Sequence, residues 1–314
     1  MKALITGVNG FVGGYLTEHL ISKGIEVWGT KLKIESIDKD LLSKITLRDM
    51  DLIEKDQVYE VINECKPDLV FHLAAQSSVA LSWKLPQLTM NVNIIGTLNL
   101  LDAIRQISLE TRILLIGSSE EYGKIKIEDI PVGEKHIIMP TNPYAISKMA
   151  QEMLAMQYVS AYNMKIILVR AFNHIGPKQS IAFVLPDFAN RIVKMEKGYL
   201  EPILKVGNLE AKRDFTDVRD IVNAYCKLII AGKSGEIYNV GSGNYYSIKY
   251  ILDELLKYTK TDIIIQEDPE RMRPSDVPII QCDNRKLKMT VDWEPSYKIE
   301  ATIIDVLNYW RSVI

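Results

Sequence analysis

A tyrosine and a lysine four positions apart are the residues best placed to move a proton. Tyr144 and Lys148 stand in the segment NPYAISK, and this spacing places both on one face of a helix, one turn apart. A free phenol has a pKa of about 10, and a neighbouring ammonium favours the phenolate and lowers that pKa. The pair could therefore donate a proton to a carbonyl oxygen that is being reduced. The hydroxyl of Ser118 could hydrogen-bond to the same oxygen, although a Tyr-x-x-x-Lys pair also occurs on ordinary exposed helix faces.

Three glycines near the start of the chain could hold a phosphate. The apolar run 3–6 predicts a short strand that stops at Gly7, and Gly10 and Gly13 follow as a helical pattern begins at Phe11. A strand, a glycine turn and a helix together offer backbone N–H groups and a helix N-terminus to a phosphate. The spacing G-x-x-G-x-x-G is one residue longer in the turn than the dinucleotide fingerprint G-x-G-x-x-G. A glycine-rich turn without a ligand therefore stays open as an alternative.

The residues after the second predicted strand bear on the choice of cofactor. In a dinucleotide fold, an Asp or Glu at the end of this strand binds the 2′-hydroxyl of the adenosine ribose. Here the strand 25–30 is followed by Lys31 and Lys33, with no acidic residue at its end. Two lysines would attract a 2′-phosphate. The sequence therefore favours NADP, with NAD as the alternative.

Strands and helices alternate through the first half of the chain. The pattern predicts strands at 3–6, 25–30, 44–47, 69–73 and 112–117, and helices at 11–23, up to about 65, at 86–107 and from 143. This alternation predicts an α/β fold of the Rossmann type, with a doubly wound parallel sheet and right-handed crossovers. Small residues from Ala74 to Ser78 follow one strand, at the sheet edge where ligands bind in such folds. A tight turn would also explain them.

The rhythm of the chain changes at about residue 172, where elements shorten and turn residues and charges become denser. We expect residues 1–171 to form an NAD(P)-binding domain, to which core segments return from about 213–240. Residues 172–314 would then form mainly a smaller C-terminal α/β lobe that binds the substrate.

Composition narrows the class of protein. The chain has 314 residues, 47% hydrophobic and 25% charged, with a formal net charge of -2. This balance argues against a nucleic-acid binder, which would show a basic face. Three cysteines and four histidines show no metal-type spacing, so we expect no metal and reduced thiols. The first strand begins at the initiator Met and no apolar run is long enough to cross a bilayer, which predicts a cytoplasmic protein without a membrane partner.

A set of motifs in a fixed order resembles the extended short-chain dehydrogenase/reductase family. The motifs span residues 5 to 222 and are ITGVNGFVG, DMDL, HLAAQSSV, GSSEEYG, NPYAISK, RAFNHIGPKQ and RDFTDVRDIV. Members of this family are epimerases, dehydratases and reductases of nucleotide sugars. The segments HLAAQSSVALSW, NPYAISKMAQE and RAFNHIGPKQ are most similar to the branch that reduces GDP-4-keto-6-deoxy-D-mannose to GDP-D-rhamnose with NAD(P)H.

The resemblance implies a role for each matching residue. Tyr144 would be the general acid at the sugar C4 oxygen, Lys148 would bind the nicotinamide ribose, and Ser118 would hydrogen-bond to the keto oxygen. The other cofactor contacts are expected at Gly7, Asn9, Gly10, Phe11, Val12 and Gly13 around the pyrophosphate, Lys31, Asp51 and Leu52 around the adenosine, Leu73, Ala74 and Ala75 along the cofactor, and Phe172 and His174 near the nicotinamide. A lone loop histidine such as His174 is also compatible with a purely structural role.

The substrate would be an anionic GDP-sugar, which requires charge-assisted contacts to two phosphates. Arg213, Arg271 and Arg273 fit that requirement, and Asp276 could accept hydrogen bonds from the nucleoside ribose. The remaining substrate contacts are expected at Gln76, Ser78, Ser119, Glu120, Asn173, Val184 and either Arg191 or Lys194. The guanine base follows only from the resemblance.

Glu120 leaves the reaction open. Related GDP-mannose 4,6-dehydratases use a hydroxyl-x-Glu arrangement with the Glu as the base at C5, and Ser118-x-Glu120 has the same spacing. A dehydratase or a 4-epimerase is therefore an alternative to the reductase. An alternative of another class is a non-catalytic, NADP-binding regulatory subunit, against which the presence of Ser118, Tyr144 and Lys148 argues. The family also implies a homodimer through the helices at 86–107 and 145–162.

Overall fold

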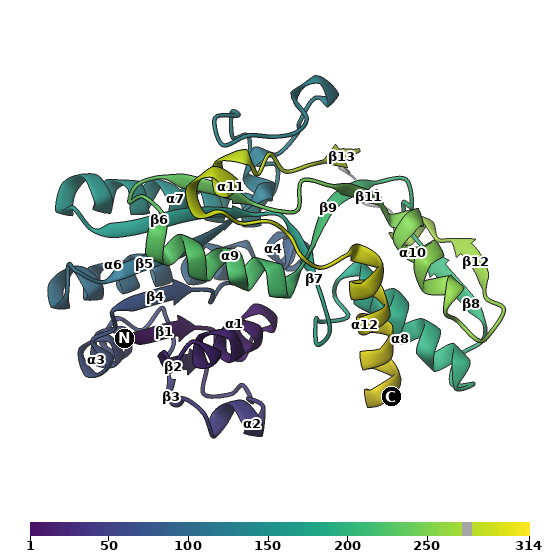
Figure 1. The fold of residues 1–314 in the computed structure, drawn as a ribbon, viewed down its shortest axis with the longest axis horizontal. Helices are drawn as coiled ribbons and strands as arrows, with labels where there is room; N and C mark the ends of the chain where they lie inside the picture. Colours follow the sequence, from purple (N-terminus) through teal and green to yellow (C-terminus); the bar gives the residue numbers. More distant parts are fainter. Residues whose placement is uncertain (272–277) are drawn as a thin grey trace.

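A seven-stranded parallel sheet is the centre of the fold (Figure 1). The computed structural model describes residues 1–271 and 278–314. The strands of this sheet are β1 (Lys2–Thr6), β2 (Glu26–Lys31), β3 (Thr46–Asp49), β4 (Leu69–His72), β5 (Arg112–Ser118), β6 (Lys165–Ala171) and β10 (Ile237–Val240). They lie in the order β10-β6-β5-β4-β1-β2-β3. The chain winds outward in both directions from a switch point between β1 and β4, which confirms the predicted doubly wound fold.

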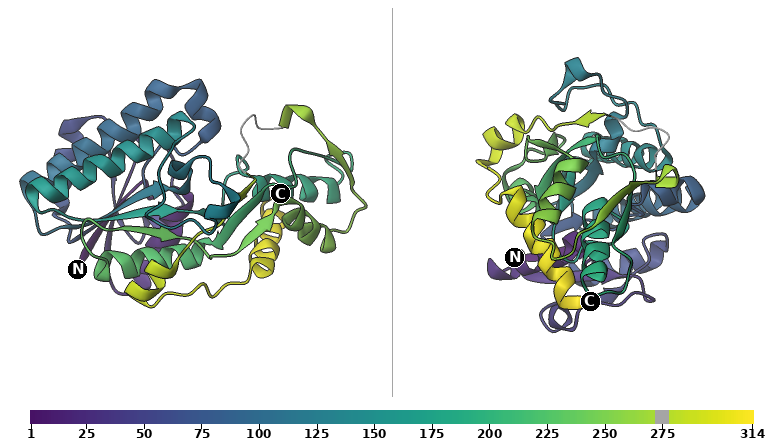
Figure 2. Two further views of the ribbon diagram at one scale, coloured as in Figure 1. Left: turned by 90° about the horizontal axis from the view of Figure 1, so that it is seen from above. Right: turned by 90° about the vertical axis from the view of Figure 1, so that its right-hand side faces the viewer.

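Helices cover both faces of the large sheet (Figure 2). One face carries α1 (Phe11–Ser22), α9 (Val218–Ala231) and α11 (Arg285–Val291), and the other carries α3 (Lys55–Cys65), α6 (Gly96–Ile107) and α7 (Pro143–Tyr162). Successive strand residues point to opposite cores: Ala3 and Ile5 pack with the first set of helices, and Leu4 packs with the second. A strand buried on both faces must be apolar throughout, which explains the continuous hydrophobic runs in the sequence.

The helical region before β5 differs from the single helix expected at 86–107. After the short α4 (Val79–Lys84), α5 (Pro86–Met90) runs into a π-helical turn (η1, Asn91–Ile95) and then into α6. A π turn often marks a functional position. Two smaller differences are that β3 begins two residues later than expected and that a short helix, α2 (Lys39–Leu42), precedes it.

The remaining strands form two small sheets on the other side of the molecule (Figure 1). β9 (Lys212–Asp217) lies between β11 (Tyr245–Ser247) and β13 (Ile279–Ile280) and also pairs with β7 (Asn173–Ile175), while β8 (Ile203–Val206) pairs with β12 (Ile264–Glu267). Helices α8 (Val184–Glu196), α10 (Ile248–Lys257) and α12 (Ile299–Val313) share a separate hydrophobic core with these strands.

The C-terminal part of the chain contributes to both regions. α9, β10 and α11 pack with the large sheet, whereas β9 belongs to the smaller sheet. We therefore propose a domain boundary near residue 172, with 218–240 and α11 returning to the first domain. In the described ranges, no helix combines the length and apolar character needed to cross a membrane. The same ranges contain no cluster of His, Cys, Asp and Glu side chains suited to a metal ion.

Candidate active site

The predicted site residues meet at one edge of the large sheet because its strands are parallel. Gly7 follows β1, Ala74 follows β4, Ser118 ends β5 and Phe172 follows β6, so all four lie at the carboxyl ends of neighbouring strands. Ser118 is the register partner of Ala171. This is the edge at which doubly wound folds bind their ligands.

The glycines of the turn allow the backbone to pack closely, and the N-terminus of α1 has no side-chain cap. Gly7 has φ +70°, and a Cβ there would lie 3.0 Å from the Ala74 Cα. A Cβ on Gly13 would lie 2.6 Å from the Val8 carbonyl oxygen. Gly10 is the N-cap of α1 and has no side chain to bond the first N–H groups of that helix. The backbone at this position therefore fits the pyrophosphate of NAD(P).

His174 packs against the start of α1. Its ring stacks on Phe11, with 6.0 Å between ring centroids and 9° between ring planes, and its Nδ1 hydrogen-bonds to the Phe172 carbonyl at 3.1 Å. Burial lowers the pKa of His174 below its ordinary value, which favours the neutral form of the ring. The contact joins the glycine turn to the chain that follows β6.

The end of β2 differs from the expectation based on sequence. Lys31 forms an ion pair with Asp49 at 2.7 Å and its side chain is only 10% exposed, so its charge is already partnered. A carboxylate is also present near this strand end: Glu35 Oε2 accepts hydrogen bonds from Asn9 Nδ2 at 3.1 Å and Leu32 N at 3.2 Å. Glu35 was not predicted from the sequence because it lies in the loop after the strand.

The residues expected around the adenine lie between β3 and α3. Asp51 Oδ1 accepts a hydrogen bond from Ile53 N, and Leu52 is buried. A Cβ on Gly96 would lie 2.8 Å from the Leu52 Cβ, so the start of α6 packs closely on this loop. Val12, Leu73, Ala74 and Ala75 are partly buried, and Leu73 and Val12 pack against the first core.

Tyr144 and Ser118 form the centre of the site. The chain enters α7 through Asn142, whose Oδ1 caps the helix by accepting from Ala145 N at 2.8 Å, and Pro143 occupies the first helical position. Tyr144 is therefore held in the first turn, where its side chain is buried and hydrogen-bonds with Ser118. Burial raises the pKa of Tyr144 above its ordinary value, and the bond with Ser118 opposes this shift.

The expected effect of Lys148 on Tyr144 is not found. Lys148 Nζ lies 6.0 Å from the Tyr144 ring centroid and donates a hydrogen bond to the Ile116 carbonyl at 2.8 Å. The net shift in the pKa of Tyr144 is upward, because burial outweighs every opposing effect. The prediction that Lys148 brings this pKa down was therefore wrong. Lys148 itself is buried, which lowers its pKa to about 8.

Glu120 lies beside this centre and has a structural partner. Its Oε2 accepts a hydrogen bond from Asn142 Nδ2 at 3.0 Å, so the side chain is tied to the N-cap of α7. The backbone N–H of Glu120 donates to Ser118 Oγ at 3.2 Å. Ser119 is buried in the short 3-10 helix η2 (Ser119–Tyr122). Asn142 was not predicted from the sequence, although an Asn before a helix-starting proline is a capping signal.

The side chains of Gln76 and Ser78 hold the loop after β4. The Gln76 amide bonds to Thr89 Oγ1 and to the backbone of Ser78, and Ser78 Oγ caps α4 by accepting from Leu81 N. Both residues were expected to bind the substrate, but in the structure these side-chain groups are engaged within the protein.

A chain of buried polar groups connects the glycine turn to α7. His72 hydrogen-bonds to Thr6 Oγ1 and to Thr97 Oγ1, each at 2.9 Å, and burial lowers its pKa to about 3, so it is neutral. In the π turn, Asn93 Nδ2 donates to Ser147 Oγ at 2.8 Å, and Ser147 Oγ donates to the Tyr144 carbonyl. These groups fix the two halves of the site relative to each other, and no motif in the sequence predicts their pairing.

The substrate-side residues come from the smaller lobe. Asn173 is exposed on β7, Val184 begins α8, and Arg213 lies on β9 with Nη1 donating to the Lys212 carbonyl. Arg191, expected on the substrate side, and Arg271, expected at a phosphate, each lie 3.5 Å from the Asp187 carboxylate, so both have an acidic partner within the protein. Lys194, the alternative to Arg191, is partly buried near the C-terminal end of α8. Arg273 and Asp276 lie outside the described residues.

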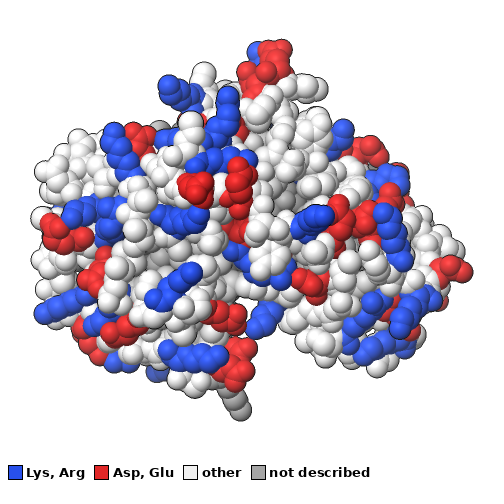
Figure 3. Space-filling view, viewed as in Figure 1, with Lys and Arg blue, Asp and Glu red and all other residues white. Residues whose placement is uncertain are grey.

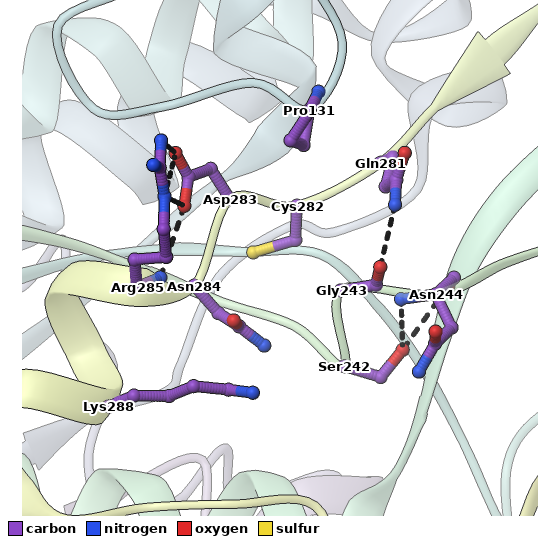
Figure 4. Close-up of a pocket in the computed structure, with 10 residues that line it drawn as sticks. All are labelled: Pro131, Ser242, Gly243, Asn244, Gln281, Cys282, Asp283, Asn284, Arg285 and Lys288. Carbon is purple, nitrogen blue, oxygen red and sulfur yellow. Dashed lines mark hydrogen bonds and ion pairs between the residues drawn. The ribbon is translucent and has the colours of Figure 1, made fainter.

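A separate cavity of about 260 Å³ lies beside the end of β10 (Figure 4). Its lining combines one residue of the chain before α7, the loop after β10, and the segment before and within α11: Pro131, Ser242, Gly243, Asn244, Gln281, Cys282, Asp283, Asn284, Arg285 and Lys288. None of the site residues predicted from the sequence lines it. On the molecular face in Figure 3, acidic and basic side chains are interspersed, in keeping with the small net charge.

Comparisons with known proteins agree with this fold and site. The profile of the family described as GDP-mannose 4,6 dehydratase matches residues 4–306. GDP-6-deoxy-D-mannose reductase of Pseudomonas aeruginosa is 33% identical over 311 residues, covering 99% of this chain and 97% of the relative. GDP-mannose 4,6-dehydratase of Vibrio cholerae is 30% identical over 348 residues, covering 98% of this chain and 92% of the relative.

Solved structures of related proteins have the same fold. RMD from Pseudomonas aeruginosa complexed with NADPH has a TM-score of 0.89 at 31% identity, covering 100% of this chain and 99% of that chain. UDP-glucose 4-epimerase of Thermus thermophilus in complex with NAD has a TM-score of 0.89 at 28% identity, covering 100% of both chains. The fold and the site therefore define an oxidoreductase-type enzyme of the extended short-chain dehydrogenase/reductase class, as the motifs indicated. Within that class, the chain belongs to the GDP-mannose 4,6-dehydratase family.

Proposed function

We propose that this chain reduces the 4-keto group of GDP-4-keto-6-deoxy-D-mannose with NAD(P)H, giving GDP-D-rhamnose. The observation that carries the proposal is the placement of Tyr144, which is buried in the first turn of α7 beside Ser118, at the end of β5. Burial raises the pKa of Tyr144, so the phenol carries its proton at neutral pH, which is the form that reduction of a carbonyl requires. The reductase from Pseudomonas aeruginosa, similar over nearly the full length, supports the same choice.

The environment of Glu120 also favours reduction. A base at the sugar C5 must be able to turn toward the C5 hydrogen, and a hydrogen bond from the protein restrains the position of a carboxylate. Glu120 Oε2 accepts such a bond from Asn142. We therefore propose that Glu120 hydrogen-bonds to the sugar and does not act at C5.

Each residue at the centre of the site would have one task. When bound, the cofactor supplies the hydride that reaches C4. Tyr144 would donate its proton to the C4 oxygen, and Ser118 Oγ would hydrogen-bond to that oxygen as negative charge develops on it. Lys148 would bind the nicotinamide ribose, with its ammonium held at the end of β5 by the Ile116 carbonyl.

Two incubations test the proposal. With NADPH and GDP-4-keto-6-deoxy-D-mannose, we expect loss of absorbance at the nicotinamide band and one GDP-rhamnose formed per NADPH oxidised. With GDP-D-mannose alone, we expect no keto product. Formation of a keto product without loss of NADPH would reject the reductase and support a dehydratase. Cofactor binding without turnover of either sugar would support a regulatory subunit.

We propose NADP(H) as the cofactor, with NAD(H) also accepted. The solved structure of a similar protein with NADPH supports the first choice, and the position of Glu35 at the end of β2 supports the second. A carboxylate that accepts hydrogen bonds from Asn9 and Leu32 would repel a 2′-phosphate but could accept a bond from a 2′-hydroxyl.

The variant Glu35→Gln is therefore expected to bind NADPH more tightly, by roughly tenfold, because it removes a negative charge near the 2′-phosphate. Its affinity for NADH should stay within about twofold. The two dissociation constants can be measured by fluorescence titration of the nicotinamide, with Glu60→Gln on the exposed surface of α3 as the control. Equal changes for the two cofactors would contradict the role assigned to Glu35.

We also propose that the chain is a cytoplasmic homodimer that pairs through the helices at 86–107 and 145–162. Large apolar side chains on these helices are exposed in the single chain: Leu88, Ile95, Ile146, Met153 and Met156. The three cysteines are free, as in a reducing compartment.

Charge placed in this surface should separate the subunits. Met153 is half exposed, at 50%, so Met153→Asp should fold normally yet bury an unpaired charge in a dimer. Light scattering should give the mass of a dimer for the wild type and of a monomer for the variant. A monomeric wild type would contradict the dimer, and Met289→Asp on α11, at 82% exposure, is a control away from these helices.

A further inference from the structure

Glu121 is a fully buried carboxylate directly behind Ser118. Its exposed fraction is 0%, and its Oε1 accepts a hydrogen bond from the backbone N–H of Ser118 at 2.7 Å. Ser118 in turn caps η2, so the two residues form a capping box. A Cβ on Gly117 would lie 2.5 Å from Glu121 Oε1, which explains why the residue before Ser118 is a glycine.

The second carboxylate oxygen of Glu121 differs from the first in its hydrogen bonding. Within the part of the chain that the structure describes, Oε2 is buried and receives no hydrogen bond. The nearest cation is Arg170, whose Nε lies 3.8 Å away. Arg170 makes its own short bonds to Glu152, at 2.9 Å and 2.6 Å. Capping a single 3-10 turn does not require a carboxylate at such a depth, because an exposed Glu could make the same bond at lower cost in desolvation.

Glu121 also acts on Lys148. Burial lowers the pKa of Lys148, and the Glu121 carboxylate is the group that opposes this shift. Burial raises the pKa of Glu121 to about 8, and the charge of Glu152 adds to this shift, while the Ser118 N–H, Arg170 and Lys148 oppose it. Besides these, the charge of Glu121 raises the pKa of Tyr144. Lys148 donates to the Ile116 carbonyl, two residues before Ser118, so both groups are fixed at the same end of β5.

We propose that Glu121 is a positioning residue of the active site. Through the Ser118 N–H it fixes the serine hydroxyl where the reacting carbonyl oxygen would lie, and in its ionised form its charge favours the ammonium form of Lys148. The inference rests on the proposed function only for the identity of the carbonyl compound. Ser118 and Lys148 would have the same tasks whether a carbonyl is reduced or the corresponding alcohol is oxidised.

Two substitutions separate these effects. Glu121→Met removes the acceptor for the Ser118 N–H, and we expect kcat to fall by about 10- to 100-fold with the cofactor dissociation constant within about twofold, because a small displacement of a catalytic group is costly. Glu121→Gln keeps an acceptor oxygen but removes the charge. It should restore most of kcat at pH 7 and move the high-pH decline of kcat to lower pH.

Glu152→Gln is the matched control, because it alters the same buried cluster at Arg170 without touching Ser118. It should lower thermal stability and leave kcat at pH 7 close to that of the wild type. The titration of Lys148, followed by NMR in lysine-labelled protein and assigned with Lys148→Met, reports on the charge effect without any substrate. We expect a lower midpoint in Glu121→Gln than in the wild type.

Failure of the proposed reaction and failure of the role of Glu121 give different experimental results. If the wild type converts GDP-mannose and not the keto sugar, the proposed function fails, and the variants are compared on that turnover. Normal kcat in a folded Glu121→Met protein would overturn the positioning of Ser118. If that variant does not fold, a Glu121→Gln protein with an unchanged pH profile and an unchanged Lys148 midpoint would overturn the proposal.

Discussion

Replacing Tyr144 with phenylalanine is expected to lower kcat by about 10²- to 10⁴-fold, the usual contribution of a general acid. The substitution removes the only atom that the mechanism assigns as the proton donor and keeps the ring. Tyr144 is buried in the first turn of α7, so the phenylalanine ring should occupy the same space. The dissociation constant for the cofactor should stay within about twofold, since the glycine turn and Lys148 are untouched.

The measurement is single-turnover oxidation of NADPH with the keto sugar, together with a separate cofactor titration. Tyr225→Phe provides a matched control: Tyr225 is also a buried tyrosine, and among the described residues its hydroxyl has no hydrogen-bond partner. It should turn over like the wild type. Full activity in the Tyr144 variant would show that another group donates the proton.

Turnover is also expected to fall as the pH rises through about 8. Burial lowers the pKa of Lys148 to about 8, so the ammonium is present below this pH and is lost above it. In its proposed role Lys148 binds the nicotinamide ribose, and the neutral amine offers one hydrogen-bond donor fewer for this contact than the ammonium, which already donates to the Ile116 carbonyl. The profile of kcat should therefore be flat on the acid side and decline on the alkaline side.

Two variants test the assignment of this decline. Lys148→Met should lower kcat by about 10²-fold or more at every pH and remove the dependence near pH 8, because no titrating group remains. Lys148→Arg keeps a charge that does not titrate in this range, so any residual activity should persist to higher pH. A decline at the same pH in both variants would assign it to a different group.

The meeting of the proposed catalytic residues could be predicted from the sequence because they are close together in the chain or in motifs. The spacing of Tyr144 and Lys148 placed both on α7, and the order of strands placed Ser118 at the end of β5. Parallel strands put their carboxyl ends on one edge, so meeting at that edge follows from the fold class alone. The glycine turn could be located in the same way.

The electrostatics of the centre could not be predicted, because a pKa depends on burial and on groups far apart in the sequence. The pair of Tyr144 and Lys148 suggested a lowered pKa for the tyrosine, yet burial raises it. The charge of Lys31 is partnered by Asp49, which is far away in the sequence but lies on the neighbouring strand. The carboxylate of Glu35 reached Asn9 only through the path of an irregular loop.

By itself, the sequence determined the family, the doubly wound sheet and the residue proposed as the proton donor, since each of these follows from local spacing, motifs and hydrophobic period. Tertiary structure alone decided which charges are partnered. In the folded chain Arg170 forms an ion pair with Glu152. Glu121 accepts a hydrogen bond from Ser118 through one oxygen, and its other oxygen has no hydrogen-bond partner among the described residues. The physical reason is that desolvation and ion pairing depend on distances between strands and helices, and these distances are set when the two cores pack against the sheet.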